Sequence, residues 1–148
     1  MGDNGPMRTV NRWCGYVHIL LGVAVAVQFV ASPTYDLDAS GDVWDVLVIP
    51  MAVGAASAVV FSLIRVQQSR ESKEGADLRS VCMLIASAAL FLLYYRLWLA
   101  WWVFDAAETP PADLRQVMWY FIDVLFVLVS IAVGRHLLRA AGGQEGRG

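Results

Sequence analysis

The chain alternates between long apolar segments and short polar ones. Four apolar runs contain almost no charged interior residues: Trp13–Ala31, Val43–Ile64, Val81–Phe104 and Val117–Leu138. Each is long enough to cross a bilayer as a helix, and lipid offers no partner to backbone groups outside helices or closed barrels. The short connections predict antiparallel neighbours. We therefore expect one all-α domain over residues 1–148, an integral membrane antiparallel four-helix bundle with spans at about 13–31, 43–64, 81–104 and 117–138.

The two ends of the chain are polar and rich in glycine. Residues 1–7 and 140–148 are predicted to be flexible tails, and the second methionine, Met7, leaves open whether residues 1–6 are native. The first apolar run is too long for an ordinary signal peptide and lacks a clear cleavage site before Ser32 and Pro33. The first helix is expected to remain as an anchor.

Composition supports an integral membrane protein and argues against some classes of function. Hydrophobic residues make up 58% of the 148, mean hydropathy is +0.55, and only 16% of residues are charged. The connections are too short for a separate extramembrane catalytic domain. A net charge of −2 without any basic tract argues against nucleic acid as a partner.

The basic residues are distributed unevenly over the connections. Nine of the eleven precede the first run, separate the second from the third, or lie at or beyond the end of the fourth: Arg8, Arg12, Arg65, Arg70, Lys73, Arg79, Arg135, Arg139 and Arg147. The other two connections are acidic, with Arg115 as their single basic residue. By the positive-inside rule, both termini are predicted to be cytoplasmic.

Small residues recur at helical spacing in two of the runs. Gly22 and Ala26 form one pair four residues apart, and Gly54 and Ala58 form another. Such pairs let helix backbones approach closely in lipid. They predict helix-packing faces, either within the bundle or with another subunit.

Two charged residues stand out deep inside the predicted spans. Arg96 is eight residues before the outer end of the third run, and Asp123 is seven residues after Gln116 at the outer start of the fourth. At 1.5 Å per residue, both lie roughly 10 to 12 Å deep. We expect an intramembrane ion pair between them, since each charge in lipid needs a partner or a purpose.

Other polar residues allow alternatives to a structural role. Asp123, with Ser130 seven residues on and Asp45 at the outer mouth of the second run, could belong to a proton or cation path. Cys14 and His18 share a helix face, and with His136 they could form a metal or haem site. The default expectation is packed thiols, His18 hydrogen-bonded within the bundle, and no metal, cofactor or catalytic residue in this chain.

Aromatic residues gather at the outer ends of the third and fourth runs. Tyr94, Trp98, Trp101 and Asp105 share one helix face, which is deeper than an interfacial belt of aromatic residues requires. We expect a contact surface for a partner subunit, and a slot for quinone or lipid is the competing interpretation. The candidates for this surface are Tyr94, Trp98, Trp101, Trp102, Asp105 and Trp119.

Three stretches resemble a group of small four-span bacterial membrane proteins. They are the segment from Asp42 to Leu47, the segment from Met51 to Gly54, and the segment from Phe121 to Phe126. The resemblance covers most of the chain with motifs of low specificity. It implies the bacterial inner membrane and an auxiliary role beside a copper-containing membrane monooxygenase of the methane, ammonia or short-alkane type. Copper would then belong to the partner subunits.

The sequence therefore predicts a noncatalytic accessory subunit that packs against larger integral membrane subunits of a redox complex and binds lipids. The alternative is a small membrane protein that binds or conducts quinone, lipid or a cation around Arg96 and Asp123.

Overall fold

The fold, seen in a computed structural model, consists of four long helices. The structure describes residues 5–35, 37–71, 77–103 and 112–142, with side chains for 8–35, 41–70, 77–100 and 114–142. The helices are α1 (Gly5–Ala31), α2 (Leu37–Glu71), α3 (Leu78–Val103) and α4 (Ala112–Gly142), and the short 3-10 helix η1 (Ser32–Thr34) follows α1. All four long helices are long and apolar enough to span a membrane, as expected for a multi-pass membrane protein.

The helices extend beyond the apolar runs that predicted them. α1 begins at Gly5 and α4 ends at Gly142, so parts of both predicted flexible tails are helical. Hydropathy locates the segment that suits lipid, whereas backbone hydrogen bonding continues through polar residues that tolerate a helix in water. Residues 1–4 and 143–148 lie outside the described part of the chain.

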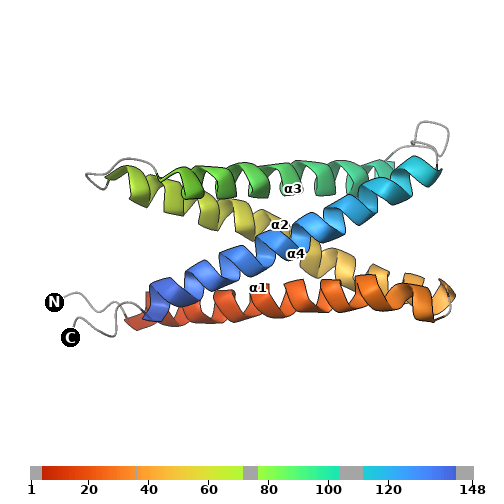
Figure 1. Cartoon of the computed structure of the whole chain (residues 1–148), viewed down its shortest axis with the longest axis horizontal. Coiled ribbons are helices and arrows are strands. Elements are labelled where there is room, and N and C mark those ends of the chain that lie inside the picture. The colour runs from red at the N-terminus through yellow and green to blue at the C-terminus, as the bar shows by residue number, and fades with distance from the viewer. Residues whose placement is uncertain (1–4, 36, 72–76, 104–111, 143–148) are drawn as a thin grey trace.

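The helices pack as two antiparallel pairs, with α4 against α1 and α3 against α2. Figure 1 shows α1 and α3 on opposite sides of the bundle, with α2 and α4 crossing between them. The start of α1 and the end of α4 lie at the same end, together with the turn from α2 to α3. α3 therefore has neighbours on one side only, and much of its surface faces away from the bundle.

Glycines permit the close contact between α1 and α4. A Cβ atom on Gly134 would lie 2.7 Å from the carbonyl oxygen of Gly15 and 2.7 Å from Cγ1 of Ile19. Farther along, a Cβ on Gly22 would lie 3.3 Å from the side chains of Ser130 and Ile131. Residue volume at these positions thus sets the distance between the two helices.

The core lies where the two pairs of helices meet. Its buried members include Val25 of α1, Ala55 of α2, Leu90 of α3 and Phe126 of α4. Gly54 packs against the ring of Phe126, with 2.9 Å between that ring and a Cβ built on the glycine. Of the predicted small-residue pairs, Gly22, Gly54 and Ala58 are buried and Ala26 is half-buried.

Candidate functional site

Asp123 lies in the interior of the bundle, near the buried Tyr94 of α3. Its side chain is 6% exposed, between the buried Ile122 and the exposed Val124 of α4. It is close enough to Tyr94 of α3 to act electrostatically on the phenol. With the residues that the structure describes, Asp123 forms neither a hydrogen bond nor an ion pair.

Arg96 lies on the outer surface of α3, so the predicted ion pair with Asp123 does not form between these two described side chains. Its exposed neighbours on the same face are Leu92 and Leu99, which are 65% and 50% exposed. Arg96 follows the buried Tyr94 by two residues, which is a rotation of about 200° around the helix axis. Depth along the two helices suggested a contact, but the helical rotation of α3 directs the guanidinium away from α4.

Tyr94 is also placed differently from the prediction. The side chain is fully buried within this chain and cannot be part of a partner surface. Its hydroxyl donates a hydrogen bond to the carbonyl oxygen of Val48, at 2.5 Å, and its ring meets that of Trp119 edge to face. Tyr94 therefore packs against α2 and α4 of its own chain.

The remaining aromatic candidates are only partly described. Trp98 and Trp119 are half-buried and pack against the core of the bundle. Trp101 and Trp102 fall in α3 but their side chains lie outside the described residues, as does Asp105 altogether.

Tyr95 is a residue that the sequence analysis did not single out. Its hydroxyl donates to the carbonyl oxygen of Ala52, at 3.2 Å. Tyr94 and Tyr95 therefore bond to carbonyls on either side of Pro50, which lies inside α2. Proline lacks an N–H and disturbs the hydrogen bonding of the preceding turn. In the sequence, Pro50 within the second run and the two tyrosines at a similar depth in the third run could have indicated this contact.

Further buried polar groups lie between α1, α2 and α4. His18 Nε2 lies 3.1 Å from the Ser57 hydroxyl, the hydrogen-bonded role within the bundle that was expected for His18. Among the side chains that the structure describes, three buried atoms have no hydrogen-bond partner, namely His18 Nδ1, Gln28 Nε2 and Ser130 Oγ. Buried groups of this kind commonly bind ordered water. A buried polar role for Gln28 was not predicted from the sequence, although a glutamine within an apolar run could have indicated one.

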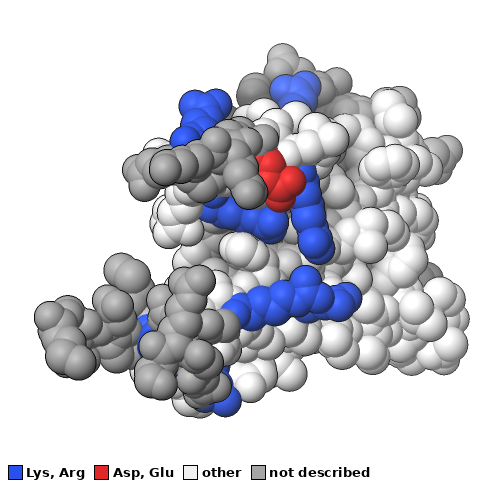
Figure 2. Space-filling view, turned by 60° about the vertical axis from the view of Figure 1, so that its left-hand side comes forward, with Lys and Arg blue, Asp and Glu red and all other residues white. Residues whose placement is uncertain are grey.

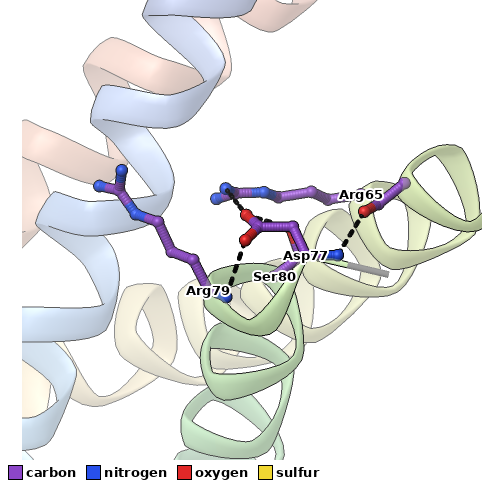
Figure 3. Close-up of polar contacts among 5 residues, drawn as sticks. Arg65, Asp77, Arg79 and Ser80 are labelled. Atoms are coloured by element: carbon purple, nitrogen blue, oxygen red, sulfur yellow. Dashed lines mark hydrogen bonds and ion pairs between the residues drawn. The ribbon is translucent and has the colours of Figure 1, made fainter. Parts of the chain in front are cut away.

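The end of the bundle where α2 ends and α3 begins carries a second polar cluster. Arg65 Nη2 of α2 lies 3.7 Å from Asp77 Oδ2, just before α3. Asp77 also accepts a hydrogen bond from the Arg79 backbone N–H, at 3.3 Å, as an N-cap residue does (Figure 3). In the sequence, Arg65 and Arg79 indicated only the topology, because their contacts with Asp77 depend on how α2 and α3 pack.

Neither a metal-binding group among the described residues nor a similar known protein indicates the function of this chain. Within residues 5–35, 37–71, 77–103 and 112–142, no group of three His, Cys, Asp or Glu residues could hold a metal ion, and this includes Cys14, His18 and His136. Searches for a matching protein-family model, a similar curated protein and a similar solved structure found none. Function must therefore be inferred from this chain alone.

Proposed function

We propose that this chain is a noncatalytic accessory subunit that packs in the membrane against larger integral membrane subunits, with the outer face of α3 as its contact surface. The observation that carries the proposal is the position of Arg96. It lies between Leu92 and Leu99 on an apolar face that the described part of the chain leaves uncovered. We name this surface, Leu92, Arg96 and Leu99, the Arg96 face.

A charge on such a face is costly in lipid. Arg96 lies seven residues before the end of α3 at Val103, which corresponds to about 10 Å along the helix. Arginine in a membrane span costs on the order of 3 kcal/mol at the bilayer centre and usually pairs with another group or reaches to the interface. A carboxylate of a partner subunit would satisfy Arg96, and Leu92 and Leu99 would provide apolar contacts beside it.

We also propose how the bundle is oriented in the membrane. Arg65, Arg79 and Arg139 lie near one another at the end that holds the start of α1 and the end of α4. The positive-inside rule assigns this end to the cytoplasm, with both termini there. The compartment we propose is the bacterial inner membrane.

The kind of partner follows from the resemblance described above. We propose larger subunits of a redox complex, with a copper-containing membrane monooxygenase as the first candidate. In that case the copper and the catalytic residues belong to the partners, and this chain provides packing surface and binds membrane lipids.

The test is to purify tagged protein from its native membrane in mild detergent and to identify the accompanying proteins by mass spectrometry. The wild-type chain should recover large redox subunits in a fixed ratio. Arg96→Leu should lower their recovery at least about tenfold, while Arg96→Lys should retain most of it because the positive charge remains.

Two controls separate an interface from a folding defect. Arg115→Leu removes an arginine from the start of α4 and should leave recovery unchanged. The melting temperature of purified Arg96→Leu should equal that of the wild type, because the side chain is exposed and makes no ion pair within the described chain. Unchanged partner recovery in Arg96→Leu, or a wild-type chain that purifies alone, would contradict the proposal.

A second candidate function is supported by Asp123. A carboxylate that is 6% exposed and lacks an ion pair in the described chain is a possible site for a proton, a cation or the polar group of a quinone. Asp123→Asn keeps the size of the side chain and removes the charge. Loss of cation or quinone binding with intact partner recovery would favour this function over the accessory role.

A further inference from the structure

The end of the bundle near the turn from α2 to α3 carries arginines from three helices. Arg65 of α2, Arg79 of α3 and Arg139 of α4 all lie close enough to His136 of α4 to act electrostatically on its imidazole. Arg65 and Arg79 also act on each other. Figure 2 shows basic side chains gathered over this end of the molecule. These side chains are distant in sequence, so the packing of α2, α3 and α4 creates the cluster.

The cluster has an excess of positive charge among the residues that the structure describes. Asp77 forms an ion pair with Arg65, at 3.7 Å. Its carboxylate also accepts hydrogen bonds from the Arg79 backbone N–H and the Ser80 hydroxyl at the start of α3. Figure 3 shows the Arg79 side chain extending away from Asp77 towards α4. Among the described side chains, three arginines and one aspartate give this cluster a net charge of +2.

A small hollow between the three helices adjoins Arg65 and His136. Its lining combines apolar side chains with polar ones at the edge: Phe61, Ser62, Arg65, Met83, Val133 and His136. The arginines lie where the apolar runs of α2, α3 and α4 give way to polar residues, which is the depth of lipid headgroups. Apolar walls beneath a basic edge suit a molecule that has an anionic head and an apolar body.

We propose that the three arginines at this end of the bundle bind the phosphate group of an anionic phospholipid at the mouth of this hollow. Guanidinium groups bind phosphate oxygens through paired, charge-assisted hydrogen bonds. The glycerol and the first acyl carbons lie against Phe61 and Met83. A free phosphate ion offers the same charge but leaves this apolar wall uncovered. The site does not depend on the Arg96 face or on the identity of a partner subunit.

The test is native mass spectrometry of the full chain, released from detergent micelles that contain equal amounts of phosphatidylglycerol and phosphatidylcholine. The wild-type chain should retain phosphatidylglycerol at least about tenfold more than phosphatidylcholine. The combined variant Arg65→Gln, Arg79→Gln and Arg139→Gln should lose this preference, since each interfacial arginine attracts anionic lipid.

A matched control keeps the net charge the same. Arg8→Gln, Arg12→Gln and Arg135→Gln together remove three charges outside the cluster and should leave the preference intact. Because Arg65 pairs with Asp77, the single variant Arg139→Gln serves as a second test that does not disturb this ion pair, and a drop of about fivefold is expected. Equal loss of preference in the cluster variant and the control, or no loss in either, would overturn the proposal.

A final experiment distinguishes a lipid from free phosphate. Vesicles containing phosphatidylglycerol should raise the melting temperature of the wild-type chain above its value in pure phosphatidylcholine vesicles. Adding 10 mM inorganic phosphate to the phosphatidylcholine sample should not reproduce this rise. If inorganic phosphate alone gives the same rise, the ligand is a soluble phosphate and the lipid assignment is wrong.

Discussion

The hydroxyl of Tyr94 on α3 donates a hydrogen bond to the backbone carbonyl of Val48 on α2, two residues before Pro50. The phenol is fully buried, and its ring also packs against Trp119 of α4. One side chain therefore joins three helices. Pro50 removes the helical hydrogen bond to the carbonyl of Val46, so the bond from Tyr94 to the Val48 carbonyl adds to the helix hydrogen bonding and does not replace the lost bond.

Tyr94→Phe tests the energy of this hydrogen bond. The ring and its contact with Trp119 remain, but the Val48 carbonyl loses the phenol. We expect the free energy of unfolding in detergent to fall by about 1 kcal/mol. Tyr16→Phe is the control, because Tyr16 is exposed and its hydroxyl should contribute little. Equal stability of Tyr94→Phe and the wild type would mean that the hydrogen bond contributes nothing.

Gly134→Ala tests the contact between α1 and α4. The new methyl group would lie 2.7 Å from the Gly15 carbonyl oxygen, so the two helix backbones must move apart. Overpacking of this kind typically costs about 1–3 kcal/mol. Thermal unfolding monitored by circular dichroism should show the loss. The same substitution at Gly41 meets nothing within 4 Å and should be neutral or slightly stabilising.

A double-mutant cycle tests the separation of Arg96 from Asp123. The two side chains form no ion pair with each other, and one is exposed while the other is buried. The effects of Arg96→Leu and Asp123→Asn on the free energy of unfolding should therefore add, with a coupling energy below about 0.5 kcal/mol. A larger favourable coupling energy would indicate that Arg96 and Asp123 form the ion pair predicted from the sequence.

Cysteine labelling tests the orientation in the membrane. In a chain without Cys14 and Cys82, Gly41→Cys and Gln68→Cys place exposed thiols near opposite ends of α2. In intact cells, a maleimide that cannot cross the membrane should label Gly41→Cys. It should label Gln68→Cys only after lysis. The reverse pattern would place the arginine-rich end outside and contradict the positive-inside assignment.

The number of long helices and the all-α fold class could be predicted from the sequence alone. Lipid-sized apolar runs have few stable structures other than helices, and this constraint acts on each run separately. The small residues Gly22 and Gly54 were also recognisable from their spacing as contact positions. Hydropathy did not locate the helix ends, since α1 continues back to Gly5 through Arg12, Asn11 and Arg8, and α4 continues past Arg139 to Gly142.

Which side of each helix faces inward depends on how the four helices pack together, and this could not be predicted from the sequence. Arg96 and Asp123 have matching depths in the sequence, yet the rotation of α3 about its axis buries Tyr94 and turns Arg96 outward. The gathering of Arg65, Arg79 and Arg139 around His136 likewise required the packing of three helices. Depth follows from counting residues along one helix, whereas rotation and neighbours depend on how all four helices pack together.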